Sequence, residues 1–134
     1  MKLVVDTNIL FSFFWKNSFT RKSLINQDLE LISPEYALEE ISRHSDEIIR
    51  KLKISLKEFE KIRKELAIMV EFIPSKEYSK YLKKALKFSP DKDDIDFFAL
   101  ALKYKISVWS NDKALKRQKV VNVISTEDLV ENYL

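Results

Sequence analysis

The sequence predicts a single α/β domain over residues 1–134, in which helices cover both faces of a central, mainly parallel sheet. Short apolar runs alternate with longer segments of helical periodicity along the chain, as they do where helices join parallel strands. The length of 134 residues suits one ordinary domain. No linker, repeat or low-complexity segment divides the chain.

The first quarter of the chain predicts two strands separated by helices. Residues 2–5 form a short apolar run that stops at Asp6, which is typical of a buried parallel strand. A helix is expected over about residues 8–15, and another after residue 17. Residues 29–32 predict the second strand.

The next segment predicts two helices from their starting residues. Ser33 suits a helix cap and Pro34 suits the first helical position. The apolar side of this helix is expected to carry Tyr36, Ile41, Ile48 and Ile49. Ser55 and Glu58 form a capping-box pattern, which predicts that the following helix begins there.

The alternation continues through the second half. Residues 70–73 predict a strand ended by Pro74, and Ser75 opens another helix. Residues 94–104 are strongly apolar and contain alanine, which predicts a buried helix.

Two further strands are expected near the end of the chain. Residues 106–109 predict one, followed by a short lysine-rich helix, and residues 120–124 predict the other. Ser125 is expected to cap a last helix that ends near Leu134.

The composition excludes several kinds of site. Cysteine is absent, which excludes disulfides and thiolate metal sites. Glycine is absent, which excludes Walker and dinucleotide-binding loops. His44 is the only histidine, so zinc sites with several imidazoles are excluded, and no serine lies in a nucleophile-elbow context. Carboxylates, hydroxyls, amides and lysines remain for chemistry.

The composition also bears on location. With 46% apolar and 34% charged residues, the sequence is typical of a globular protein. No window approaches the eighteen apolar residues of a membrane span. The apolar run at residues 9–15 is interrupted by Ser12 and is not expected to be a signal peptide. We expect a cytoplasmic protein that does not associate with membranes.

Charges are unevenly distributed although the net charge is only +3. Lysines gather in residues 76–87 and 113–119, and acids gather in residues 91–96. Basic segments beside an acidic pocket suit an enzyme with a polyanionic substrate, although each lysine run is equally consistent with a solvated helix face. The best candidates for phosphate contacts are Lys113, Lys116, Arg117 and Lys119.

Four acids from distant segments are expected to meet at one edge of the sheet. Asp6 and Asp112 follow two predicted strands, and ligands collect at the carboxyl ends of parallel strands. Asp94 and Glu40 lie in the first and second turns of predicted helices. Each aspartate alone is explained by helix capping. If the four acids meet, they need bound protons or cations, because two carboxylates about 4 Å apart repel by roughly 4 kcal/mol. Oxygen ligands suit Mg²⁺ or Mn²⁺.

Four motifs, in order along the chain, resemble those of the PIN-domain ribonuclease family. They are VDTNIL at residues 5–10, LEEI at 38–41, DDIDFFALA at 93–101 and VWSNDK at 108–113. The fourth motif has serine in place of the family's usual threonine, and Asn111 in place of a frequent glycine. The resemblance covers essentially the whole chain.

This resemblance implies a three-layer α/β/α fold and Mg²⁺- or Mn²⁺-dependent hydrolysis of single-stranded RNA by an activated water. Carried over by position, the catalytic and metal-binding acids would be Asp6, Glu40, Asp94 and Asp112. Asp96 would add a fifth carboxylate, and Asn8 and Ser110 would orient the acids by hydrogen bonding.

Two of these metal-binding acids have an acidic neighbour in the sequence that could take the same role. Glu39 and Glu40 point about 100° apart on a helix, and Glu40 is preferred because an isoleucine follows it. Asp93 and Asp94 pose the same choice, and the spacing to the buried helix favours Asp94.

Other residues have simpler interpretations. His44 is expected to be exposed, although it would share a helix face with Glu40 if that helix continued. The aromatic segment is expected to pack in the core or in a dimer rather than stack on bases. It contains Phe11, Phe13, Phe14 and Trp15.

Several functions remain open at the level of the sequence. The chain resembles VapC-type toxins, which act with a small antitoxin partner, and PIN-type proteins commonly form homodimers or homotetramers. A housekeeping RNA-processing nuclease and a non-catalytic RNA-binding protein are the alternatives. A phosphohydrolase of the haloacid-dehalogenase kind is disfavoured because Asn8 occupies the place of its second aspartate.

Overall fold

A five-stranded parallel sheet forms the middle of the molecule in the computed structural model, which describes residues 1–15 and 28–133. The strand order is β3-β2-β1-β4-β5, and every neighbouring pair is parallel. The strands are β1 (Lys2–Val5), β2 (Glu30–Pro34), β3 (Val70–Ile73), β4 (Ser107–Trp109) and β5 (Val123–Ile124).

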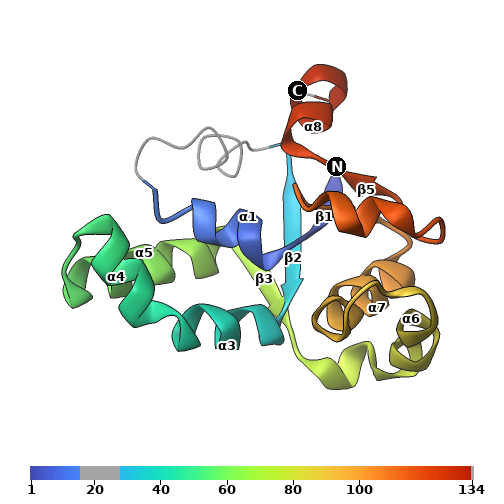
Figure 1. Ribbon diagram of the computed structural model, residues 1–134, viewed down its shortest axis with the longest axis horizontal. Helices are drawn as coiled ribbons and strands as arrows, with labels where there is room; N and C mark the ends of the chain where they lie inside the picture. The colour runs from blue at the N-terminus through green and yellow to red at the C-terminus, as the bar shows by residue number, and fades with distance from the viewer. Residues whose placement is uncertain (16–27, 134) are drawn as a thin grey trace.

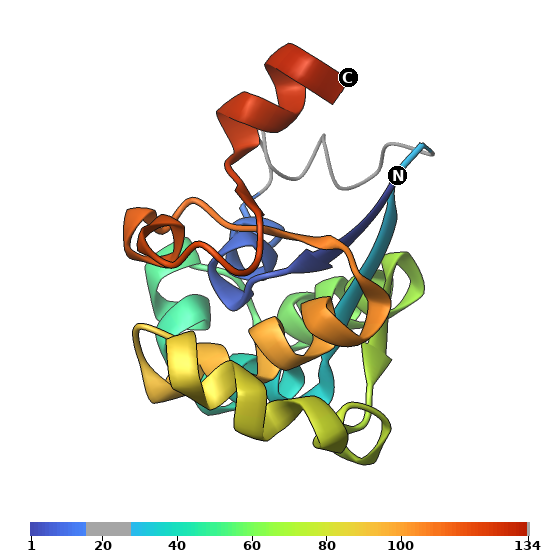
Figure 2. The same cartoon turned by 90° about the vertical axis from the view of Figure 1, so that its right-hand side faces the viewer.

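Helices cover both faces of this sheet (Figure 1). One face carries α1 (Thr7–Ser12), α3 (Glu35–Arg43), α4 (Ser45–Leu52) and α5 (Leu56–Met69). The other carries α6 (Leu82–Phe88) and α7 (Ile95–Tyr104), which face the viewer in Figure 2. The three-layer α/β/α prediction is therefore confirmed.

Short 3₁₀ segments and one more helix complete the described chain. The 3₁₀ segments are η1 (Ser75–Glu77), η2 (Ser79–Tyr81), η3 (Lys92–Asp94) and η4 (Lys113–Arg117). The helix α8 (Thr126–Tyr133) projects from the end of the sheet in both views. Within the part of the chain that is described, no helix is both long and apolar enough to cross a bilayer.

The core lies between the sheet and its two helical layers. Helix α7 contributes an uninterrupted buried run, residues 97–101, and contacts β1, β2 and β4. On the opposite face, Phe14 stacks on Phe59 of α5 with ring centroids 5.0 Å apart. Phe13 and Phe14 are buried, so their predicted core packing is confirmed, whereas Trp15 is 56% exposed.

The strand order creates a switch point between β1 and β4. The chain passes from β1 to β2 on one side, and later returns to β4 on the other side. Val5 lies in register with Trp109, and the Asp6 amide donates to the Trp109 carbonyl at 3.1 Å. The residues that follow β1 and β4 therefore emerge side by side, where parallel sheets form their binding crevices.

The predicted helix start at Ser33 and Pro34 was wrong, because both residues belong to β2. Ser33 is fully buried, and its hydroxyl donates to the Val5 carbonyl at 2.9 Å. Pro34 lies opposite Ile73 of β3 with extended backbone angles. Because both residues pair in the sheet, the helix begins only at Glu35, and Pro34 is its N-cap.

The single helix expected from Pro34 to Ile49 is two helices. His44 has φ −99° and ψ 11°, outside the helical range, and it ends α3 and precedes α4. Because α4 runs in a different direction from α3, each of the two short helices packs its own apolar side on the core. His44 is exposed, as predicted.

Other element boundaries also differ from the predictions. The helix expected from Ser75 begins as two 3₁₀ turns before α6, and the lysine-rich helix is the 3₁₀ segment η4. The last strand covers only Val123–Ile124, because Gln118 hydrogen-bonds the backbone of Val121 and holds the preceding residues in a turn. The helix predicted after residue 17 lies outside the described residues.

Candidate active site

Asp6 lies at the centre of the switch point. It directly follows β1 and caps α1, accepting a hydrogen bond from the Asn8 amide at 2.8 Å on Oδ1. Its other oxygen, Oδ2, accepts the hydroxyl of Ser110. The side chain is only 9% exposed, so two neighbouring groups fix the position of a buried carboxylate.

Ser110 links Asp6 to Asp112. Its hydroxyl accepts the Asp112 amide at 3.0 Å, and it therefore presents its proton to Asp6. Asp112 caps η4 by accepting the Ala114 amide at 2.9 Å. The end of β4 thus brings a second carboxylate next to the first.

Glu40 approaches the same region from α3. Its Oε1 accepts the hydroxyl of Thr7 at 2.7 Å, and Thr7 is the residue after Asp6. Glu40 is partly buried, whereas its neighbour Glu39 is exposed and lines a different hollow. The helix therefore turns Glu40, and not Glu39, toward Asp6.

Asp94 supplies the fourth carboxylate from the start of α7, where it is the N-cap residue. Asp93 points instead to Tyr36, whose hydroxyl donates to it at 3.0 Å. Asp91 caps η3 by accepting the Asp93 amide at 3.1 Å. Of the three aspartates in this segment, Asp94 is therefore the candidate that remains for the site.

The pKa values of three of these acids depend on the charges of their acidic neighbours. The pKa of Asp94 is raised to about 6, mainly by burial and also by the charges of Asp6, Asp91 and Asp112. Burial also raises the pKa of Asp6, to which the charge of Asp112 adds, while hydrogen bonds from Ser110 and Asn8 oppose the increase.

The pKa of Glu40 is raised in the same way. Burial is the largest cause, and the charges of Asp93 and Asp6 act in the same direction. The hydrogen bond from Thr7 and the charge of Arg43 oppose them. Desolvation and like charges are the two conditions that cations relieve, so the acids form a site that favours positive charge.

The acids also satisfy the chemical requirements of a divalent cation. Their donors are all carboxylate oxygens, which Mg²⁺ and Mn²⁺ prefer, and none of the four makes a salt bridge within the described residues. Residues 1–15 and 28–133 contain no ready-made group of three acid or imidazole side chains with metal-binding geometry. Among the described residues, the four acids therefore do not form a complete coordination shell.

Asp96, the predicted fifth carboxylate, makes its hydrogen bond to a residue outside the four acids. Its Oδ2 accepts the hydroxyl of the buried Tyr78. Both residues line a hollow of about 210 Å³ together with Glu35 and Glu39. The charge of Asp96, with burial as the larger cause, raises the pKa of Tyr78.

Asn8 and Ser110 were the residues expected to orient the acids. Ser110 contacts Asp6 through its side chain, but Asn8 does so through its backbone amide. The Asn8 side chain is exposed. Thr7, to which the sequence interpretation assigned no role, makes a side-chain contact with Glu40. Thr7 lies within the first motif.

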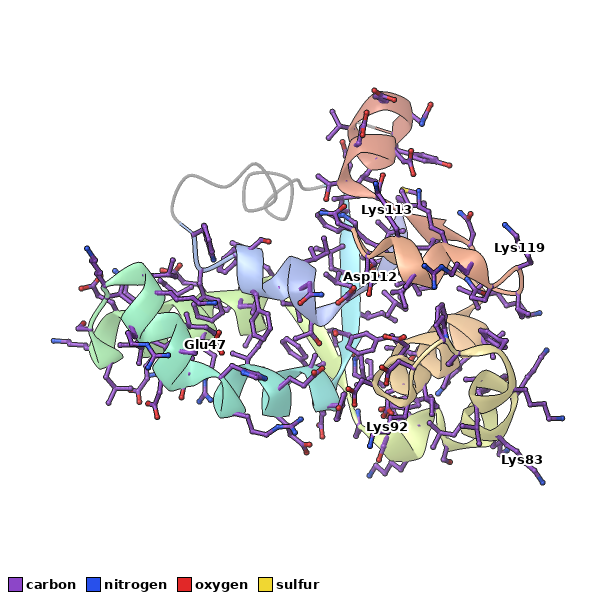
Figure 3. The ribbon with its side chains drawn as sticks, in the orientation of Figure 1. Glu47, Lys83, Lys92, Asp112, Lys113 and Lys119 are labelled. Atoms are coloured by element: carbon purple, nitrogen blue, oxygen red, sulfur yellow. The ribbon has the colours of Figure 1, made fainter. Side chains whose placement is uncertain are left out.

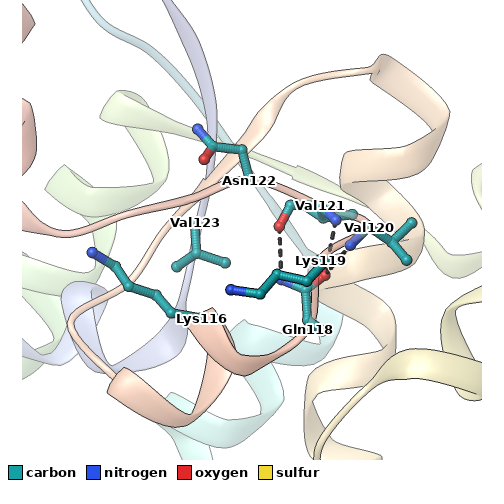
Figure 4. Close-up of a pocket in the computed structure, with 7 residues that line it drawn as sticks. All are labelled: Lys116, Gln118, Lys119, Val120, Val121, Asn122 and Val123. Atoms are coloured by element: carbon teal, nitrogen blue, oxygen red, sulfur yellow. Dashed lines mark hydrogen bonds between the residues drawn. The ribbon is translucent and has the colours of Figure 1, made fainter.

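The predicted phosphate-binding residues occupy two neighbouring hollows. Lys113 and Lys116 line one of about 310 Å³ with Ser110 and Asp112. Lys116 and Lys119 line another of about 430 Å³, where Gln118 holds the backbone of Val121 (Figure 4).

Only part of this basic run lies beside the acids. Lys113 is adjacent to Asp112, whereas Lys119 lies beyond the far end of η4 (Figure 3). Lys116 forms a salt bridge with Asp128 at 2.8 Å. Arg117 is exposed on η4 and lines neither hollow. Lys113 is therefore the cation best placed for a substrate at the acids.

The fold and the candidate site together define an α/β protein with a doubly wound parallel sheet and carboxylates at its switch point. Residues 4–131 match the family model described as PIN domain. The chain therefore belongs to the PIN domain family, which indicates a nuclease, and such domains typically use divalent metals. No curated protein matches the sequence.

Proposed function

We propose that this protein is a metal-dependent endoribonuclease that hydrolyses phosphodiester bonds of single-stranded RNA. The observation that supports the proposal most strongly is the electrostatic coupling of Asp6 with Glu40, Asp94 and Asp112, which come from four separate segments. Carboxylates that raise one another's pKa are unfavourable without a cation. Their arrangement is therefore best explained by a function that uses one.

Some residues of the site would bind the metal, and others would position those ligands. Asp6, Glu40, Asp94 and Asp112 would hold Mg²⁺ or Mn²⁺, which when bound lowers the pKa of a coordinated water and neutralises charge on a phosphate oxygen. Ser110 and Thr7 fix the carboxylates of Asp6 and Glu40 by hydrogen bonds, which preserves their geometry while the substrate binds.

Substrate positioning falls to another feature of the site. Lys113, beside Asp112, would contact a backbone phosphate. A single strand is the expected substrate because the acids lie between two separate hollows that an extended chain could cross.

RNA cleavage by purified protein tests this proposal. Labelled single-stranded RNA is incubated with Mg²⁺, with Mn²⁺ and with EDTA, using wild type and Asp6→Asn. We expect cleavage only with metal, and a loss of at least about 100-fold in rate for Asp6→Asn, since it removes a central carboxylate. Asp46→Asn, an exposed acid on α4, is the matched control and should cleave like wild type.

Two results would reject the proposal. Equal cleavage by Asp6→Asn would assign the activity to another site or to a contaminant. RNA binding without cleavage in any metal, by protein with a cooperative unfolding transition, would favour the non-catalytic RNA-binding alternative.

The cellular role and partners extend the proposal on the basis of the motif resemblance alone. We infer a VapC-type toxin that acts in the cytoplasm, is blocked by a small antitoxin and forms a homodimer or homotetramer. Induced expression should then arrest growth, and expression of Asp6→Asn should not. Normal growth with active enzyme would instead favour a housekeeping RNA-processing nuclease.

A further inference from the structure

A second hollow adjoins the acids on the side of α1, α3 and α4. It measures about 450 Å³, within the usual range of ligand sites. Asn8 and Glu40 are part of its wall, so it is continuous with the candidate active site. Its aromatic and apolar wall consists of Phe11, Trp15, His44, Ile48 and Leu52.

Two rings of this hollow contact each other. Phe11 meets His44 edge to face, with centroids 5.9 Å apart and an interplanar angle of 83°. On another side, His44 Nδ1 lies 3.4 Å from Glu47 Oε2. The imidazole lies there because α3 ends at His44 and α4 starts in a new direction.

Trp15 is the unusual member of this group. Phe13 and Phe14, its neighbours in sequence, are buried in the core, whereas Trp15 leaves 56% of its surface exposed. A large exposed aromatic ring beside an apolar hollow is typical of a surface that binds a partner through a flat, apolar face. Within the described chain, its position cannot be explained by core packing.

We propose that this hollow binds a nucleobase next to the scissile phosphate, with Trp15 and His44 as its stacking surfaces; the inference rests on the proposed nuclease function. A base has apolar faces that stack on aromatic rings and polar edges that need hydrogen-bond partners. Asn8, whose side chain is exposed, supplies such a partner in the same wall.

The distribution of charge favours a base over a phosphate here. The wall contains the acids Glu40 and Glu47, and Lys51 is already paired with Glu47 at 2.9 Å. The lysine-lined hollow beside Asp112 lies on the other side of the acids. The site is thus aromatic on one side and basic on the other, which would bind one nucleotide through its base and the next through its phosphate.

Equilibrium binding of short RNA tests the subsite without any cleavage. A labelled eight-nucleotide single strand is titrated in EDTA with protein that carries Asp94→Asn, so that hydrolysis is prevented and carboxylate repulsion is reduced. Adding Trp15→Ala should weaken binding by about 10-fold, as expected for one base–aromatic stack. Trp15→Phe should retain most of the affinity.

Two controls separate stacking from a general loss of binding. Tyr133→Ala removes an aromatic ring of similar exposure, 55%, on α8, outside the hollow, and should bind normally. An RNA with abasic positions should bind less tightly than the intact strand to protein with Trp15, and this difference should be smaller for Trp15→Ala. Trp15 fluorescence should be quenched by the intact strand, while the fully buried Trp109 should not respond.

The outcomes distinguish this inference from the nuclease proposal. Unchanged affinity of Trp15→Ala, or no preference for intact over abasic RNA, would overturn the base subsite even if the wild type cleaves RNA. A protein partner would then be the better occupant. Base-dependent binding that requires Trp15 would support the subsite even if no metal produced cleavage.

Discussion

At the residue scale, two hydroxyl side chains define the geometry of the acids. Ser110 contacts Asp6, and Thr7 contacts Glu40. Both are buried, so water cannot readily replace either hydrogen bond. Their effect is to hold carboxylates that would otherwise move apart under mutual repulsion.

We therefore predict that Thr7→Val reduces metal affinity and not only stability. The variant keeps the shape of the side chain but removes the donor to Glu40, and loss of such a supporting contact typically costs 10- to 100-fold in metal affinity. The metal concentration for half-maximal RNA cleavage should rise by about that factor. Thr7→Ser restores the hydroxyl and should restore the affinity; an equal defect in both variants would contradict the assigned role.

A second prediction concerns the pH dependence of stability at Asp94. Its pKa is raised from 3.8 to about 6 in the folded protein, so the folded state binds its proton more tightly than the unfolded state. Stability in EDTA should therefore fall as pH rises from about 4 to about 6. Asp94→Asn removes this loss and should stabilise the metal-free protein at pH 7.

The size of this effect follows from the shift and the exposure of the group. Each pKa unit corresponds to about 1.4 kcal/mol, but Asp94 is partly exposed and solvent screening reduces the effect to the order of 1 kcal/mol. Thermal unfolding should show Tm about 4 °C above wild type at pH 7 and little difference at pH 4. A variant less stable than wild type at pH 7 would refute the repulsion that we infer.

At the element scale, local sequence predicted most elements but not their exact boundaries. Ser33 and Pro34 have the composition of a helix start, yet pairing with β1 and β3 keeps them extended. The break at His44 is equally invisible, because neither glycine nor proline marks it. In both places tertiary packing overrides local preference.

The absence of glycine leaves two helix ends in an unfavourable conformation. Lys53 and Lys105 adopt the left-handed region, with φ of 54° and 56°, which disfavours residues with a Cβ atom. Lys105 connects the buried helix α7 to β4. It is thus a position where glycine would relieve strain directly.

Lys105→Gly should raise the free energy of unfolding by about 1 kcal/mol. Urea denaturation of wild type and variant measures it. Lys64→Gly, in the middle of α5 and exposed, is the opposite control and should lower stability by about 1 kcal/mol. A lower free energy of unfolding for Lys105→Gly would show that the lysine side chain stabilises the fold by more than its left-handed backbone conformation destabilises it.

At the scale of the whole molecule, the sheet brings distant residues together. Asp6 and Asp112 could be predicted as neighbours because each follows a strand and parallel strands share their carboxyl edge. Asp94 could be preferred over Asp93 from its spacing to the buried helix, and in the structure Asp93 instead accepts a hydrogen bond from Tyr36. Asp96 likewise lies beside Tyr78, a contact that no local pattern indicates.

The charge layout leads to a prediction for RNA affinity. Lys113 lies beside Asp112, whereas other lysines cover α6 at a distance, as Lys83 does in Figure 3. Lys113→Ala should weaken single-strand binding and reduce the slope of log K against log salt concentration by about 0.7, the value for one phosphate contact. Lys57→Ala on α5 should leave the slope unchanged. An equal slope for wild type and Lys113→Ala would place the phosphate elsewhere.

The central claim is that the four coupled carboxylates are a binding site for a divalent cation. Electron paramagnetic resonance of Mn²⁺, titrated into wild type, Asp6→Asn and Asp46→Asn, measures it without RNA. We predict that wild type and Asp46→Asn bind Mn²⁺ equally and that Asp6→Asn loses at least about 10-fold in affinity. Equal binding by Asp6→Asn, or no binding by wild type, would contradict the account.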